Sequence, residues 1–247
     1  MCKILLQLTL LSIALINYVN AQAKVVGGTP VPISQAPYVV NIRETNTGSL
    51  ICGGTLITSK LVTSAANCLK GKYTIKQLTI QGGASFFSET GYRRTVDLLV
   101  FPTAFDTTTY NHDVCVLRLK TAMPSSLTPV QIAYNGVSLG ESLKIYGWGL
   151  TTEDGTPSNV LQTTTITPVA KAECRLSYEL TGTMFCAAAP GKDACRFDGG
   201  GPAINANNKM VGIVSWGYGC ARADYPGVYT SIAKTGDFIK MCISRYG

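Results

Sequence analysis

One segment decides how the fold is interpreted: Cys195-Arg196-Phe197-Asp198-Gly199-Gly200-Gly201-Pro202. Three glycines followed by a proline indicate a tight loop rather than a helix or strand. Outward from this loop, short runs rich in Val, Ile, Leu and Tyr alternate with turn residues, at 38–42, 54–57, 78–80, 114–119, 143–147 and 210–215. So many short strands with little helical periodicity predict an all-β fold of barrels or sandwiches.

The N-terminus indicates a secreted protein. Residues 1–21 have the pattern of a signal peptide, with Lys3, an apolar run and a small-residue cleavage site, and residues 22–24 remain as a short propeptide. The formal charge of +7 falls to about +5 when residues 1–24, with their two lysines, are removed. Without a run of basic residues, we predict no nucleic-acid and no membrane partner.

The cysteine pattern indicates disulfides rather than a metal site. Nine cysteines are present, and Cys2 lies in the predicted signal peptide, which leaves eight in the rest of the chain. An even number in a secreted chain predicts four disulfides. The wide spacing and the single histidine, His112, argue against zinc, and we predict no metal and no cofactor.

Several motifs, in order along residues 25–247, resemble those of trypsin-like serine proteases. They are Val-Val-Gly-Gly at 25–28, and the segments 52–57, 62–68, 111–119, 147–149, 195–202, 215–217 and 226–229. The resemblance implies two six-stranded antiparallel Greek-key β-barrels, at about 25–135 and 136–232, followed by a short C-terminal helix at 234–244. It also implies the disulfides Cys52–Cys68, Cys174–Cys186 and Cys195–Cys220.

Two cysteines, Cys115 and Cys242, have no counterpart in the resembled family. Cys115 follows Asp113 on a predicted strand, and Cys242 lies on the predicted terminal helix. Parity favours a fourth bridge between them. The alternative is two buried free thiols, because cysteine also packs as a small apolar residue.

The catalytic positions implied by the resemblance depart from the family pattern. Asp113 matches the triad aspartate, whereas Asn67 stands at the histidine position and Gly199 at the serine position. An amide takes no proton near neutral pH, and glycine has no nucleophile. Phe197, at a glycine position of the oxyanion loop, is expected to strain that loop, turn its amide away or place its ring across the cleft. We therefore predict a pseudoprotease that is not an enzyme.

Other functional positions match the family. The resemblance implies a pocket for lysine or arginine side chains with Asp193 at its floor, lined by Ser215, Trp216, Gly217 and Gly227. It also implies activation by cleavage after Lys24, which frees the ammonium of Val25 to pair with Asp198. The alternative for the Asp193 pocket is that the family architecture is retained but the pocket binds no ligand.

A narrower resemblance is to the mite gut protease and group 3 allergen branch, in particular the inactivated serine protease paralogues of the scabies mite. It implies a secreted binding protein that engages host or gut proteins and interferes with host defence proteolysis, such as the complement cascade. We also predict that the protein is a monomer. The alternatives are residual endopeptidase activity after Lys or Arg, or a decoy that captures protease inhibitors or substrates through the Asp193 pocket.

Overall fold

The structure is a computed structural model of the chain, and it describes residues 25–247. The predicted signal peptide (1–21) and propeptide (22–24), including Lys24, lie outside the described residues. Within the described part, no helix is long and apolar enough to cross a membrane.

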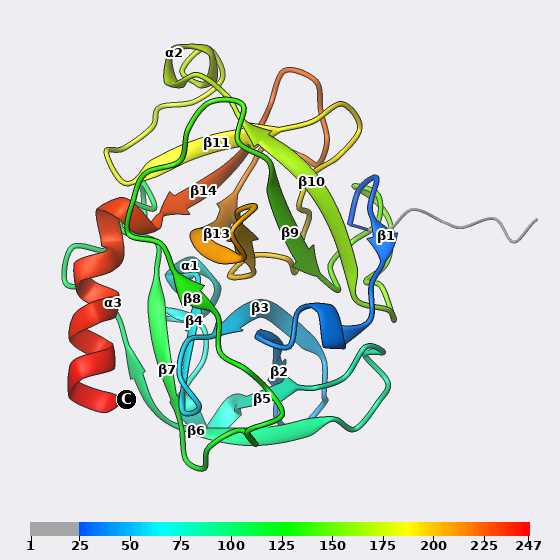
Figure 1. Cartoon of the computed structure of the whole chain (residues 1–247), viewed down its shortest axis with the longest axis vertical. Helices are drawn as coiled ribbons and strands as arrows, with labels where there is room; N and C mark the ends of the chain where they lie inside the picture. The colour runs from blue at the N-terminus through cyan, green and yellow to red at the C-terminus, as the bar shows by residue number, and fades with distance from the viewer. Residues whose placement is uncertain (1–24) are drawn as a thin grey trace, which may run out of the picture.

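The first half of the chain forms a closed six-stranded barrel, drawn in blue to green in the lower part of Figure 1. Its strands pair in the order β2-β3-β4-β7-β6-β5. Their bounds are Val39–Glu44 (β2), Leu50–Leu56 (β3), Leu61–Ser64 (β4), Leu78–Gly82 (β5), Tyr92–Val100 (β6) and Cys115–Leu119 (β7). The barrel closes around fully buried aliphatic side chains such as Ile42, Leu56 and Ile80.

The second half forms another barrel, because β9 pairs with both β10 and β12 and so closes the sheet. Its strands are Leu143–Gly147 (β9), Gln162–Pro168 (β10), Met184–Ala188 (β11), Pro202–Ile204 (β12), Lys209–Trp216 (β13) and Gly227–Ser231 (β14). Strand β10 alternates strictly between buried and half-buried residues, as expected for a strand with one face on the core. Two short strands extend this sheet: β1 (Thr29–Pro30) and β8 (Gln131–Ile132).

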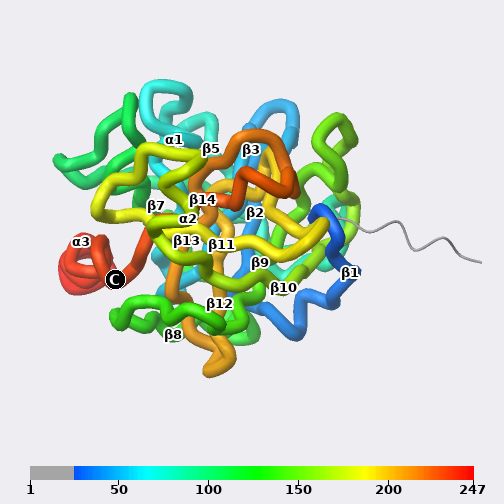
Figure 2. The backbone as a smooth tube through the Cα atoms, turned by 90° about the horizontal axis from the view of Figure 1, so that it is seen from above, coloured from blue at the N-terminus to red at the C-terminus, as the bar shows by residue number. Residues whose placement is uncertain are grey.

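Helices are few. The longest is α3 (Ile232–Tyr246), which lies along the outer side of the molecule in Figures 1 and 2 and contacts β7, β13 and β14. It buries Ile232, Ile239 and Cys242 against the first barrel's core. The short helices are η1 (Ile33–Gln35), α1 (Ala66–Leu69), η2 (Ile75–Gln77) and α2 (Lys171–Cys174). The predicted fold, two six-stranded antiparallel barrels with a C-terminal helix, is confirmed.

Three disulfides join the predicted partners: Cys52–Cys68, Cys174–Cys186 and Cys195–Cys220. The predicted fourth bridge is wrong, because Cys115 and Cys242 are buried free thiols. Both belong to the apolar core between α3 and the first barrel. Burial raises the pKa of the Cys115 thiol and raises that of Cys242 to about 11, so neither readily forms the thiolate that disulfide formation requires.

The free thiols give a first testable prediction. Of the eight cysteines in residues 25–247, alkylation in denaturant without reductant should modify Cys115 and Cys242 and leave the other six unmodified. Without denaturant neither thiol should react, because both are fully buried. Peptide mass mapping checks both results, and a Cys115–Cys242 linked peptide would contradict the assignment.

Candidate functional site

The main cavity, of about 540 Å³, lies where loops of the two barrels meet. Part of its lining comes from the first barrel: Ile51, Cys52, Asn67, Cys68, Lys72 and Tyr73. The rest comes from the loops of the second barrel and includes Asp193, Phe197, Gly199, Ser215, Trp216, Gly217 and Gly227. The structure thus brings most of the predicted site residues to one cleft. Within residues 25–247 no cluster of acidic, histidine or cysteine side chains is arranged to hold a metal ion.

Asn67 lines the cleft, and Asp113 lies buried behind it. Asp113 is fully buried just before β7, and its Oδ1 accepts a hydrogen bond from the Asn67 backbone amide at 2.7 Å. Its Oδ2 accepts one from Asn67 Nδ2 and one from the Ser215 hydroxyl, each at 2.5 Å. Burial raises the pKa of the Asp113 carboxyl to about 6, although these hydrogen bonds lower it.

The Asn67 side chain acts as a donor here. Asn67 is the second residue of α1, and its amide group donates to Asp113 and, at 3.0 Å, to the Ser215 carbonyl. Both N–H bonds of this NH₂ group are therefore directed at fixed acceptors. The arrangement holds α1 of the first barrel against β13 of the second.

Gly199 lies against the Cys52–Cys68 disulfide. A Cβ atom at position 199 would lie 3.3 Å from Cys68 Sγ and 3.5 Å from Cys52 Sγ. A side chain fits there with small shifts. The next residue is different: Gly200 has φ +84°, and a Cβ there would lie 2.1 Å from Ser64 Oγ, so only glycine fits.

Phe197 occupies the loop in a strained backbone conformation, with φ +73°. The residue lines the cleft and is 37% exposed. The expected strain and the expected ring in the cleft are therefore both present. Neither the Phe197 nor the Gly199 backbone amide donates a hydrogen bond to another described residue.

The Asp193 pocket lies at one side of the cavity. Asp193 is 4% exposed, its Oδ2 accepts a hydrogen bond from the Ala221 amide at 2.9 Å, and its Oδ1 has no partner in the described chain. A Cβ at Gly227 would lie 2.6 Å from that free oxygen, so glycine there keeps the space open. Burial raises the pKa of Asp193 to about 6. A buried carboxylate oxygen without a hydrogen-bond partner is energetically unfavourable.

Asp198 is buried away from the cleft, with 1% exposure. It accepts hydrogen bonds from the Gly149 amide at 2.8 Å and the Cys195 amide at 3.0 Å, and burial raises its pKa to about 7. Val25, also 1% exposed, packs in the second barrel's core. Pairing of a freed Val25 ammonium with Asp198 stays a prediction.

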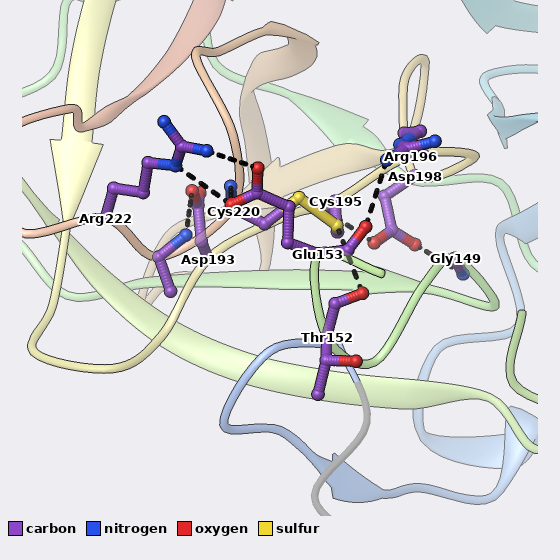
Figure 3. The surroundings of a disulfide bond; sticks show 10 residues. Gly149, Thr152, Glu153, Asp193, Cys195, Arg196, Asp198, Cys220 and Arg222 are labelled. Carbon is purple, nitrogen blue, oxygen red and sulfur yellow. Dashed lines mark hydrogen bonds and ion pairs between the residues drawn. A yellow bond between two sulfur atoms is a disulfide. The ribbon is translucent and has the colours of Figure 1, made fainter. Parts of the chain in front are cut away.

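An ion pair at the edge of the cavity was not predicted from the sequence. Glu153, in the loop after β9, accepts two hydrogen bonds from Arg222, at 2.9 and 2.6 Å. Its backbone carbonyl accepts one from Arg196 at 3.1 Å. Figure 3 shows these residues around the Cys195–Cys220 disulfide, with Asp193 beside them. No local pattern indicates this pair, because 69 residues separate its partners.

An aromatic cluster beside the pocket was also missed. The Trp216 ring lies 4.8 Å from that of Tyr178 and 6.4 Å from that of Tyr110, between ring centroids. Tyr225 lies 6.0 Å from Tyr178 and 5.0 Å from Tyr218. These four tyrosines lie on three loops that are far apart in the chain, and no sequence pattern links them.

Two interlocked barrels, a cleft between them, an acidic pocket and three disulfides define the architecture of a chymotrypsin-type serine protease domain. Comparison with known proteins agrees: the family model for trypsin matches residues 25–239. Trypsin beta of Drosophila erecta is 34% identical over 225 residues, which cover 87% of each chain. Trypsin 5G1 of Aedes aegypti is 33% identical over 91% of this chain and 86% of its own. The chain therefore belongs to the trypsin family.

These comparisons correct one prediction. We predicted that the chain is not an enzyme, from Asn67 and Gly199 at the histidine and serine positions. The finding against it is that the relatives the chain matches are named trypsins, at similar identity over most of their length. The substitutions at the triad positions do not by themselves support the prediction that the chain is not an enzyme. The assignment to the trypsin family does not depend on them.

Proposed function

We propose that this protein recognises polypeptides through a lysine or arginine side chain that enters the cleft and reaches Asp193. The observation that carries the proposal is the unpartnered Asp193 Oδ1, buried at the side of an open cavity. An ammonium or guanidinium group would complete its hydrogen bonding and match its charge. Gly217, whose Cβ position has no neighbour closer than 3.8 Å, leaves the approach to the pocket free.

Hydrolysis of the bound polypeptide is the second candidate function, because the relatives are named trypsins. Two observations favour it: the backbone amides of Phe197 and Gly199 are free to stabilise an oxyanion, and Asp113 is in place. Asn67 and Gly199 supply neither a base nor a hydroxyl, so a water molecule would attack the scissile carbonyl carbon, and its proton would pass through solvent water to the leaving amine as the C–N bond breaks. Binding and cleavage are therefore measured separately.

Asp193→Asn tests the proposal. We expect the natural chain to bind an aromatic amidine or an arginine peptide, and the variant to bind it at least about 100-fold more weakly, because a buried charge pair is lost. Affinity should also fall as the pH drops through about 6, where Asp193 gains a proton. Calorimetric titration measures both effects.

The matched control is Asp237→Asn, which removes one acid from the exposed face of α3 and should leave the affinity unchanged. A natural chain that binds neither ligand at pH 7.5 would overturn the proposal, as would equal affinities in the Asp193 variant and the natural chain.

Secretion is part of the proposal and is supported by the three disulfides, which form in oxidising compartments. The narrower assignments stay predictions: the likeness to mite proteases and scabies mite paralogues, the monomeric state, and interference with host proteolysis such as complement. A pull-down from host plasma, with Asp193→Asn as the comparison, would identify partners that use the pocket.

A further inference from the structure

A second cavity, of about 420 Å³, is not used by the proposed function. Among the described residues, it shares no lining residue with the cleft that holds Asp193. Three segments far apart in the chain form it: η1 with the residues that lead into β2, the segment that ends at the start of β8, and the turn between β12 and β13. Parallel pairing of β8 with the start of β13 holds the second and third segments together.

The turn between β12 and β13 places two asparagines at this cavity. Asn205 Oδ1 accepts hydrogen bonds from the backbone amides of Asn207 and Lys209, each at 3.1 Å. Asn208 has φ +55°, a left-handed conformation that asparagine adopts more readily than most residues do. The turn itself therefore fixes the backbone of Asn207 and Asn208, and no ligand is needed to order it.

The Asn208 side chain is oriented by Tyr38. The Tyr38 hydroxyl donates to Asn208 Oδ1 at 3.0 Å, and Tyr38 is only 2% exposed. Burial raises the pKa of Tyr38, so its hydroxyl stays protonated and keeps this hydrogen bond. Because Oδ1 accepts it, the two N–H bonds of Nδ2 are the donors that the Asn208 amide offers to a ligand.

The lining of the cavity is rich in hydrogen-bonding groups, and no charged side chain of the described residues belongs to it. Six exposed side chains supply hydroxyl or amide groups: Ser34, Gln35, Thr128, Gln131, Asn207 and Asn208. A charged ligand would lose water here without gaining a counter-charge, and an apolar ligand would leave these groups without partners. Ligand hydroxyls match them, because each hydroxyl both donates and accepts, as each side-chain amide does.

The cavity also has apolar surface, from Pro37, Pro129 and the Tyr38 ring. A sugar ring has hydroxyls at its edge and C–H groups on its faces, so it contacts both kinds of surface. The volume falls within the range of about 300–1,000 Å³ that is typical of small-molecule sites. We propose that this cavity binds a neutral mono- or disaccharide, independently of the Asp193 cleft.

The first test is a calorimetric titration of the natural chain with maltose, lactose and N,N′-diacetylchitobiose. At least one of them should bind with a Kd of about 1 mM or below, as expected for several hydrogen bonds formed at once. Glucuronate, which is charged, and acetyl-diglycine amide, which has no hydroxyl, should bind at least about tenfold more weakly. No binding of any neutral sugar would overturn the inference, as would equal or tighter binding of either comparison ligand.

The second test locates the bound sugar with Gln131→Ala and Asn208→Gly. Gln131 is exposed, and glycine adopts the positive φ of Asn208 without strain, so both variants should fold. Each should bind the sugar about tenfold more weakly, because it lacks one amide that contacts the ligand. Asn46→Ala, which removes an exposed amide outside the cavity, is the matched control and should bind as the natural chain does. Unchanged affinity in both cavity variants would overturn the inference.

Discussion

The double variant Asn67→His/Gly199→Ser is expected to hydrolyse peptides after lysine or arginine at least about 10³-fold faster than the natural chain. The reason is that it adds a base and a nucleophile where Asp113 is already positioned to orient a histidine. A serine Cβ at 199 would contact Cys68 Sγ at 3.3 Å, which requires only a small adjustment. A chromogenic arginine peptide reports the rate.

Single variants provide the controls for this gain. Asn67→His alone and Gly199→Ser alone should each stay close to the natural rate, because the base and the nucleophile act as a unit. Adding Phe197→Gly to the double variant should raise the rate further, by about 10- to 100-fold, if the strained loop misplaces an oxyanion donor. A double variant no faster than the natural chain would show that the cleft geometry, and not only residue identity, limits hydrolysis.

The second large effect concerns pH. Three buried carboxyls have raised pKa values: about 6 for Asp113, about 6 for Asp193 and about 7 for Asp198. Between pH 4 and 7 these three carboxyls hold more protons in the folded chain than in the unfolded chain, so their contribution to stability falls as the pH rises. For Asp198 alone, a shift from 3.8 to about 7 corresponds to about 4 kcal/mol.

We therefore expect the uncleaved chain to resist urea better at pH 4.5 than at pH 7.5. Urea unfolding at the two values measures the difference, and Asp198→Asn should reduce it because the variant has no proton to lose there. Asp113→Asn provides a second comparison in case the first variant folds poorly. A chain that gains stability between pH 4.5 and 7.5 would contradict the burial of these carboxyls without a cation.

Cleavage after Lys24 should change this dependence. A freed Val25 ammonium that pairs with Asp198 would favour the charged carboxylate and lower its pKa. The cleaved chain should then lose less stability towards neutral pH than the uncleaved chain does. The same urea measurements, made before and after cleavage, decide whether the predicted pairing forms.

The all-β fold class follows from short apolar runs and turn residues, which are local signals in the sequence. The two barrels, the three disulfides and the positions of Asp113, Asn67 and Asp193 followed from the resemblance of several motifs, in order, to those of trypsin-like serine proteases. The residues Asn67 and Gly199 at the histidine and serine positions led to the prediction that the chain is not an enzyme. The relatives named trypsins contradict that prediction.

Three features became visible only in the folded chain. Whether Cys115 meets Cys242 as a thiol or a bridge depends on how α3 packs on β7, which no local pattern encodes. The Glu153–Arg222 pair joins loops far apart in the chain. At Phe197 the sequence showed an unusual residue, and the folded loop showed its positive φ and its exposed ring. Such features arise from contacts between distant segments, and those contacts exist only once the two barrels have formed.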